Sequence, residues 1–237
     1  QVAWWYASGD FAVAINAAVT ASSNQSTVTV TPGAQIDIDT TVTIDTACHV
    51  NFNKRLLNYT GSGTAVAVSS TAATYENLAI TTSLDQSNAS LIGLLETEGR
   101  RVTRHITSIK NFTVGWKINS TTSGGISHNT YFLDHNIGSA KFGLVIHSAD
   151  PGFTSAIDFH GFEAYGVAGP TAGSIGIQID SIYIAGSLQF YSPTIQTFAV
   201  GVSDNSDNVT GNNYYSPYME GNTKHFETGA NCDYIFI

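Results

Sequence analysis

The sequence predicts an all-β protein, a right-handed parallel β-helix (solenoid) with a short N-terminal capping helix. Three observations lead to this prediction. The large apolar residues are mainly Val, Ile, Phe and Tyr, which favour strands; short strand-like segments recur as a unit; and no helical segment separates successive units. We expect residues 1–35 to contain the capping helix and the first strand, and residues 36–237 to form the coils.

Composition and charge exclude several classes of partner. Hydrophobic residues make up 42% of the 237 positions, enough for a continuous core. The net charge is −9, without a long Lys/Arg run or a segment of membrane-spanning length, so we expect no nucleic-acid partner and no membrane insertion. Arg100, Arg101 and Arg104 are interpreted as a solvated face, with contact to an acidic sugar as the alternative.

Cys48 and Cys232 are expected to be free thiols.

The first elements follow from a change of period. A helix is expected from about Gly9 to Ala21, with Ser8 or Asp10 as its cap. From Thr27 onward the apolar period becomes two, which is typical of strands, and a turn at Pro32-Gly33 divides the first two strands. The apolar residues of the helix that share one face are Phe11, Ala14, Ile15, Ala18 and Val19, and those of the strands are Val28, Val30, Ile36, Ile38, Val42, Ile44, Val50 and Phe52.

A repeated unit decides the architecture. Phe190–Gln196 recurs 24 residues later as Tyr214–Glu220; Phe159–Tyr165 fits the same template, and Phe132–Gly138 fits it more loosely. A second marker is Gly followed by apolar, any and apolar residues, and it occurs at Gly115–Ile118, Gly143–Ile146 and Gly176–Ile179, and in part at Gly201–Ser203.

Units of this size must stack. Each holds two or three strands of three to five residues, which are too short to form a sandwich alone, and one coil of a parallel β-helix buries its inward side chains against its neighbours. A β-propeller would require longer blades with hairpins, and a leucine-rich repeat would show Leu ladders.

The N-terminal part of the chain resembles a known family. Gly9–Val19 followed by Thr27–Ile38 resembles the opening segment of the pectin-lyase-like superfamily, in which a helix containing Asp caps the coil before a Thr-Val strand and a Pro-x-Gly turn. Tyr75–Ile80 also resembles a coil of that family. Asn24–Ser26 and Gln35 depart from the pattern, which places glycines and an aromatic residue there.

Within this superfamily the late coil Tyr214–Gly221 resembles those of bacteriophage tailspikes and polysaccharide depolymerases, with secreted plant-cell-wall enzymes as the alternative. The resemblance implies a virion tail protein, located outside the cell, that assembles as a parallel homotrimer and acts on bacterial surface polysaccharide. The resembling motifs are architectural and include no catalytic residue.

Alignment of the repeats places side chains in outward columns. Sugar rings have apolar faces edged with hydroxyls, so a sugar site needs aromatic rings together with carboxylates or amides. The alternative is that the same residues stabilise the stack or form a subunit interface. The columns are His160, Tyr191 and Tyr215; Asn136, Glu163, Thr194 and Tyr218; and Tyr165, Gln196 and Glu220.

Paired carboxylates are the candidates for glycosidic hydrolysis, which needs a proton donor and a base or nucleophile. Glu163, Asp204 and Asp207 are the candidate catalytic residues, because adjacent coils and a shared loop would bring acids together; the alternative is that the loop acids build turns. The candidate substrate-binding residues are His160, Tyr165, Asp180, Tyr191, Tyr215, Tyr218 and Glu220.

No cofactor is expected. The seven His residues lack metal-ligand spacing, and a calcium site at Asp180, Asp204 and Asp207 is the less favoured alternative. Three functions therefore stay open: a tailspike glycosidase, a non-catalytic receptor-binding spike, and a structural β-helix of the virion.

Overall fold

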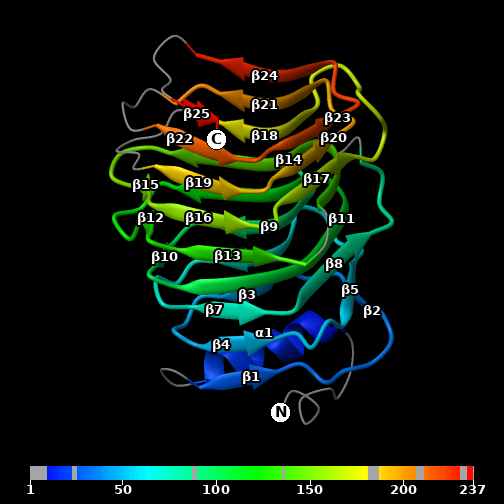
Figure 1. Ribbon diagram of the computed structural model, residues 1–237. Helices are drawn as coiled ribbons and strands as arrows, with labels where there is room; N and C mark the ends of the chain where they lie inside the picture. Colours follow the sequence, from blue (N-terminus) through cyan, green and yellow to red (C-terminus); the bar gives the residue numbers. More distant parts are fainter. Residues whose placement is uncertain are drawn as a thin grey trace.

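The structure, a computed structural model, describes residues 10–22, 26–86, 90–134, 137–180, 187–206, 211–229 and 234–236. The chain forms a parallel β-helix whose coils stack from the N-terminal end, where the single described helix lies, to the C-terminal end (Figure 1). The predicted all-β class, the parallel strands and the short N-terminal helix are confirmed, and the coils are consistent with the right-handed form.

Helix α1 (Phe11–Ala21) caps the first coil. Asp10 is the N-cap: one carboxylate oxygen accepts from the backbone N–H of Ala12 at 3.0 Å, and the other accepts from the N–H of Thr40 at 2.7 Å. The cap therefore also ties the helix to the coil. The buried residues of the helix are Phe11, Ala12, Ala14, Ile15 and Val19.

Asn16 pairs the helix with the edge of β3 (Val42–Ile44). Its side-chain amide donates to the carbonyl of Thr41 at 2.8 Å and accepts from the N–H of Thr43 at 2.8 Å. These are the hydrogen bonds that a neighbouring strand would make, so the amide satisfies backbone groups that the first coil would otherwise leave unpaired.

Strands stack in three parallel columns, called here the first, second and third sheets. The first contains β1 (Thr27–Thr29), β4 (His49–Asn51), β7 (Thr74–Glu76), the start of β11 (Thr103–Ser120), β13 (Thr130–Leu133), β16 (Ile157–His160), β19 (Leu188–Tyr191), β22 (Asn212–Tyr215) and β25 (Tyr234–Phe236). The second contains β2 (Ile36–Ile38), β5 (Leu56–Tyr59), β8 (Leu78–Thr82), the middle of β11, the start of β14 (Ile137–Ser148), β17 (Glu163–Gly166), β20 (Thr194–Gln196) and β23 (Tyr218–Glu220).

The third sheet contains β3, β6 (Thr64–Val68), β9 (Ile92–Glu96), the ends of β11 and β14, β18 (Ile175–Ile179), β21 (Val200–Asp204) and β24 (Lys224–Thr228). Three two-residue strands, β10 (Gly99–Arg100), β12 (Ile126–Ser127) and β15 (Thr154–Ser155), pair at a corner between the third and first sheets. The long strands β11 and β14 turn corners and so belong to more than one column.

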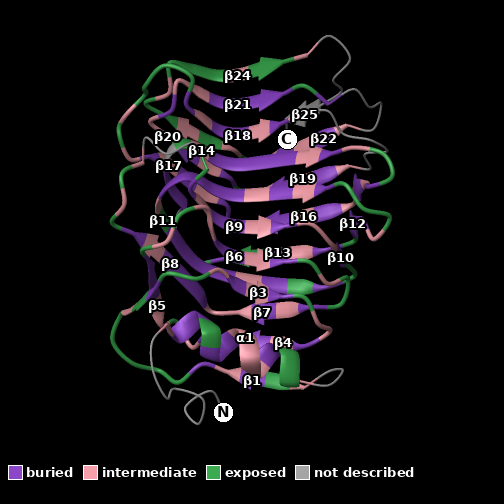
Figure 2. Cartoon of the chain, turned by 180° about the vertical axis from the view of Figure 1, so that it is seen from behind, coloured by how far each residue is buried: buried purple, intermediate pink, exposed green. Residues whose placement is uncertain are grey.

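The core is a column of buried side chains inside the coils. Figure 2 shows that buried residues recur in the strands along the stack of coils. Tyr131, Phe159, Phe190 and Tyr214 stack there on successive strands, with ring centroids 5.4, 4.5 and 5.0 Å apart. Parallel in-register strands bring equivalent residues to nearly the distance at which aromatic rings stack. The inward aromatic residues of the repeat therefore lock one coil onto the next.

The glycine marker of the repeat lies where the coils have no room for a Cβ atom. A Cβ on Gly143 would lie 2.5 Å from the carbonyl oxygen of Gly176, and one on Gly176 would lie 2.6 Å from that of Gly201. At Gly115 the same atom would lie 2.2 Å from Cγ2 of Ile137. Gly93 has the same environment and belongs to the series, although the sequence pattern missed it.

An ion pair lies inside the core. Arg104 donates to Glu96 at 2.6 Å and to the carbonyl of Ala73, and both charged side chains are fully buried. The hydroxyls of Tyr75 and Tyr131 donate to the two carboxylate oxygens of Glu96, each at 2.5 Å. Burial raises the pKa of Tyr131, and the nearby Glu96 carboxylate raises it further, so the phenol stays protonated as a donor.

The expectation that Arg104 belongs to a solvated face is therefore wrong. Strand alternation points Arg104 inward between the outward Thr103 and His105, and Glu96 on the third sheet faces it across the core. Arg100 and Arg101 are exposed, as expected.

The predicted free thiol at Cys48 is confirmed, and its side chain is buried, which raises the pKa of the thiol. Cys232 lies outside the described residues. Within the described part of the chain, no helix has the length and apolar character needed to cross a membrane.

Candidate functional site

The outward columns predicted from the repeats are present as strand register. Successive strands of the first and second sheets pair in parallel, so residues at equal repeat positions lie one above another. Asn136, which the prediction also placed in a column, lies outside the described residues. The observed columns are His160, Tyr191 and Tyr215; Glu163, Thr194 and Tyr218; and Tyr165, Gln196 and Glu220.

The first column is an outer aromatic ladder of four rings, Phe132, His160, Tyr191 and Tyr215. Their centroids are 5.0, 4.6 and 4.9 Å apart, and the ring planes differ by 18°, 7° and 6°. The same strands thus carry one aromatic stack toward the core and a second on the outside.

The sequence alignment missed Phe132 as a member of this ladder, because it matched the start of the repeat Phe132–Gly138 to Phe159 and not to His160. Phe132 pairs with His160, whereas Gly138 pairs with Tyr165 as the template predicted. The corner between β13 and β14 is therefore one residue longer than the corner between β16 and β17. Since side chains alternate along a strand, that one residue decides whether Phe132 faces the core or the outside.

Stacking leaves the edges of the ladder, more than its ring faces, available to a ligand. Each inner ring of the ladder is covered on both faces by its neighbours, so the expected stacking of a sugar on these rings has little surface to use. The Tyr215 hydroxyl donates to Gln189 at 2.9 Å, and the amide of Asn213 donates to the same oxygen at 3.1 Å. Burial raises the pKa of Tyr191, as do the charges of Asp158 and Tyr215. The ladder therefore presents a row of hydrogen-bonding groups.

Tyr218 offers the open ring that a sugar needs. Its side chain is 53% exposed, and its hydroxyl donates to Glu220 at 2.9 Å. The amide of Gln196 donates to the same carboxylate oxygen at 3.2 Å. The hydrogen bond to Glu220 raises the pKa of Tyr218. A flat exposed ring beside a fixed carboxylate is an arrangement that fits the face and the hydroxyl edge of one sugar.

Tyr165 lies flat over the preceding coil. A Cβ on Gly138 would lie 2.6 Å from the Tyr165 ring, so the absence of a side chain at Gly138 makes space for it. Burial raises the pKa of Tyr165, and the nearby Glu163 carboxylate raises it further. Glu163 is partly exposed and lies on the same outer surface as Tyr165, as its column position predicted.

Asp204 does not face the outer surface, and the expectation that it lies there is wrong. Its side chain is fully buried. The carboxylate accepts from the hydroxyl of Ser206 at 2.7 Å and from the amide of Asn212 at 2.7 Å. β21 ends with Asp204, which pairs with the buried Ile179 of the preceding coil and points inward as Ile179 does. Asp204 therefore cannot form a carboxylate pair with Glu163, which lies on the outer surface.

Asp180 lies apart from the outer ladder. Asp180 accepts from Gln178 at 2.9 Å at the end of β18, on a different sheet from the ladder. Asp207 lies outside the described residues. Among the described side chains no group of three His, Cys, Asp or Glu residues is arranged to hold a metal ion.

A polar cluster that sequence reasoning missed continues the ladder toward the N-terminal end. His105 pairs in register with Phe132, and its Nε2 lies 2.8 Å from the Asp134 carboxylate. Asp134 is also bound by Lys54 at 3.1 Å, while the N–H of Asn77 donates to Nδ1 of His105 at 3.4 Å. Burial raises the pKa of Asp134, but the hydrogen bonds and charges of His105 and Lys54 outweigh this effect and lower it overall.

Glu76 and His49 extend this cluster. Nε2 of His49 lies 3.4 Å from a carboxylate oxygen of Glu76, and the amide of Asn51 donates to the same Glu76 oxygen. A cavity of about 320 Å³ is lined by both residues together with Arg101 and His105. No local motif signals this cluster, because its members lie on separate coils and meet only through the register of β4, β7 and β11.

Comparison with protein-family models, curated proteins and solved structures finds no match to this chain.

Proposed function

We propose that this chain binds a bacterial surface polysaccharide, O-antigen or capsule, as part of a bacteriophage tailspike in the virion tail. The observation that carries the proposal is the exposed Tyr218 ring beside the Glu220 carboxylate that Gln196 holds in place. This pair lies on the coils that also carry Tyr191 and Tyr215 of the outer ladder.

The two columns together suit an extended chain of sugars. Equivalent positions on successive coils are spaced at about 4.8 Å, so a polysaccharide lying along the rod meets similar groups repeatedly. The ladder supplies ring edges and hydroxyls, and the neighbouring column supplies Glu163, Gln196 and Glu220. Contact areas of this kind gain affinity by adding several weak subsites.

Polysaccharide hydrolysis is the second candidate function. The favouring observation is the cavity of about 320 Å³ that contains Glu76 and His105, with Asp134 hydrogen-bonded to His105. Carboxylates in a groove supply the proton donor and the base that glycosidic cleavage requires. Glu163 stays a candidate acid on the outer surface, but its proposed partnership with Asp204 is abandoned because Asp204 is buried.

A parallel homotrimer is the assembly that we propose for this protein. A column of apolar side chains follows the third sheet from coil to coil. All of its members except the buried Val114 are partly exposed, and their apolar surface would be better covered by a second chain. Light scattering at micromolar concentration should give three times the mass of one chain; the mass of a single chain would contradict the assembly. The column contains Ile92, Val114, Phe142, Ile175 and Val200.

The binding proposal is tested with a panel of purified O-antigens and capsules. Tyr218→Ala should weaken binding of the recognised polysaccharide about fivefold or more, because loss of one aromatic contact costs about 1 kcal/mol. Val13→Ala is the matched control, since Val13 is also exposed but lies on α1 at the opposite end of the rod. Failure to bind any polysaccharide, or equal binding by Tyr218→Ala, would contradict the proposal.

Product sizing separates the two candidate functions. If the bound polysaccharide is shortened, Glu76→Gln and Asp134→Asn should each retain binding while at least one lowers turnover about a hundredfold. If the wild-type protein shortens nothing that it binds, the chain is a binding spike without hydrolase activity.

A further inference from the structure

We propose that a second site, at the corner between the third and first sheets, binds the carboxylate group of an acidic sugar. The site is a cavity of about 500 Å³ lined by Arg100, Arg101, His128 and Phe153, with Ser127 and Ser155 at its base. Its volume lies in the range of small-molecule pockets. The inference rests on the proposed polysaccharide function and adds the class of sugar that is recognised.

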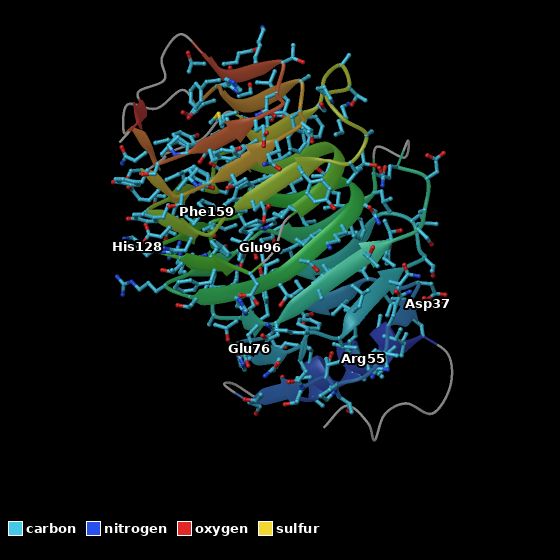
Figure 3. The ribbon with its side chains drawn as sticks, turned by 45° about the vertical axis from the view of Figure 1, so that its right-hand side comes forward. Asp37, Arg55, Glu76, Glu96, His128 and Phe159 are labelled. Carbon is cyan, nitrogen blue, oxygen red and sulfur yellow. The ribbon has the colours of Figure 1, made fainter. Side chains whose placement is uncertain are left out.

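Two hydrogen-bond donors, the guanidinium of Arg101 and the imidazole of His128, occupy equivalent positions on successive coils. The N–H of Arg101 donates to the carbonyl of Ser127, and the N–H of His128 donates to that of Ser155, so the two residues occupy the same corner one coil apart. Both side chains are exposed, and Figure 3 places His128 at the outer edge of the coil. An oxyanion bound between them would receive hydrogen bonds from both coils.

Arg100 provides a rigid wall for the cavity. Its guanidinium donates to the carbonyls of Ser123, at 2.8 Å, and Gly124, and lies 4.8 Å from the centre of the Phe153 ring. These contacts hold the charge in place, and no described carboxylate forms an ion pair with Arg100. A guanidinium stacked on an aromatic ring keeps its positive field while its position is fixed.

Glu96 is paired with Arg104 in the core. Glu98 accepts from the hydroxyl of Thr122 at 2.6 Å and keeps its charge, so one carboxylate lies near the two guanidinium groups of Arg100 and Arg101. In a protein with a net charge of −9, a corner with Arg100, Arg101 and an adjacent imidazole is therefore a local site of positive potential. This field favours anionic over neutral sugars.

The second site is continuous with the polar cluster. Arg101 lines both the 500 Å³ cavity and the 320 Å³ cavity that contains Glu76 and His105. A uronic-acid residue whose carboxylate binds Arg101 would therefore place the next sugar toward His105 and the outer ladder. The corner site thus sets both the charge and the position of the bound chain.

The test is an NMR titration with three probes: methyl glucuronoside, methyl glucoside and inorganic phosphate. The glucuronoside should shift the imidazole signals of His128 and bind about tenfold more tightly than the glucoside or phosphate. Arg101→Asn and His128→Asn should each weaken that binding by about fivefold or more. Asn suits these positions because both residues have positive φ, 55° and 56°. Lys110→Asn, which removes an exposed positive charge from the second sheet, is the matched control and should change nothing.

Several results would overturn the inference. Equal affinity for the glucoside would show that charge is not recognised, and tighter binding of phosphate would assign the site to a free anion. If the imidazole signals of His128 do not shift, or if Arg101→Asn binds the glucuronoside as tightly as the wild type, then this corner does not bind the sugar. If the recognised polysaccharide is neutral, and its binding is weakened by Tyr218→Ala but not by Arg101→Asn, this inference is contradicted. The proposed binding function is then still supported.

Discussion

Arg104 donates a hydrogen bond of 2.6 Å to Glu96 in the core, where both side chains are fully buried. Because Glu96→Gln leaves the guanidinium without its countercharge, we expect the free energy of unfolding to fall by about 3–5 kcal/mol. Denaturant unfolding measures this loss. An unchanged unfolding midpoint would show that the buried charge is compensated from elsewhere.

The double variant Glu96→Leu with Arg104→Met is the control for this prediction. Removing both charges together also removes the cost of burying them, so the double variant should be more stable than Glu96→Gln. If it is the less stable of the two, the hydrogen bonds of the network, and not the unpaired charge, dominate the loss.

Asp204 is predicted to act in folding and not in catalysis. Asp204→Ala removes the buried carboxylate that accepts from the side-chain amide of Asn212 at 2.7 Å, which should lower the free energy of unfolding by about 1–3 kcal/mol. Polysaccharide affinity and any cleavage rate of the folded variant should match those of the wild type. A folded Asp204→Ala protein with normal affinity and no cleavage would contradict the prediction.

Tyr191 separates the two roles of the outer ladder. Tyr191→Ala removes the ring contacts with His160 and Tyr215, and each such contact is worth about 0.5–1.5 kcal/mol, so thermal unfolding should occur at a lower temperature. Tyr191→Phe keeps the stack and removes the hydroxyl, so it should retain stability and weaken polysaccharide binding. Normal binding by Tyr191→Phe would mean that this ring edge makes no contact with the ligand.

Asp10 should make the cap on the first coil sensitive to acid. Burial raises its pKa, but the hydrogen bonds from Thr40 and Ala12 outweigh this, and the pKa lies below the ordinary 3.8. Because the folded-state pKa is the lower one, the stabilisation is present above about pH 4 and is lost as the pH falls through the folded value. Asp10→Asn should flatten the stability profile below about pH 4. An unchanged acid profile in Asp10→Asn would assign the acid sensitivity to other carboxylates.

The architecture could be predicted because the same types of residue recur at the same positions of successive repeats. The Phe159, Phe190 and Tyr214 repeats and the Gly143 and Gly176 markers each report a local requirement, a ring that must stack or a Cβ that has no room. Such requirements recur in every coil, so they appear as a pattern along the chain.

The site could be predicted only where a residue keeps the phase of its repeat. Tyr191, Tyr215 and Tyr218 lie at their expected positions because their corners have equal lengths. Phe132 was aligned one residue out of register because the corner that follows it is one residue longer. Asp204 was expected to point outward, but it pairs with Ile179, an inward apolar residue of the preceding coil, and therefore points inward.

The sequence by itself determined the solenoid, its capping helix and the outward columns, since strand alternation and coil spacing are local properties of the chain. Only the tertiary structure decided that Arg104 meets Glu96 in the core, that His105 meets Asp134 on the outside, and that Arg101 and His128 share one corner. Each of these pairs joins different strands or coils through corners of variable length. A change of one residue in a corner reverses the side of the sheet to which a side chain points, so these contacts depend on the assembled coils and not on any local pattern.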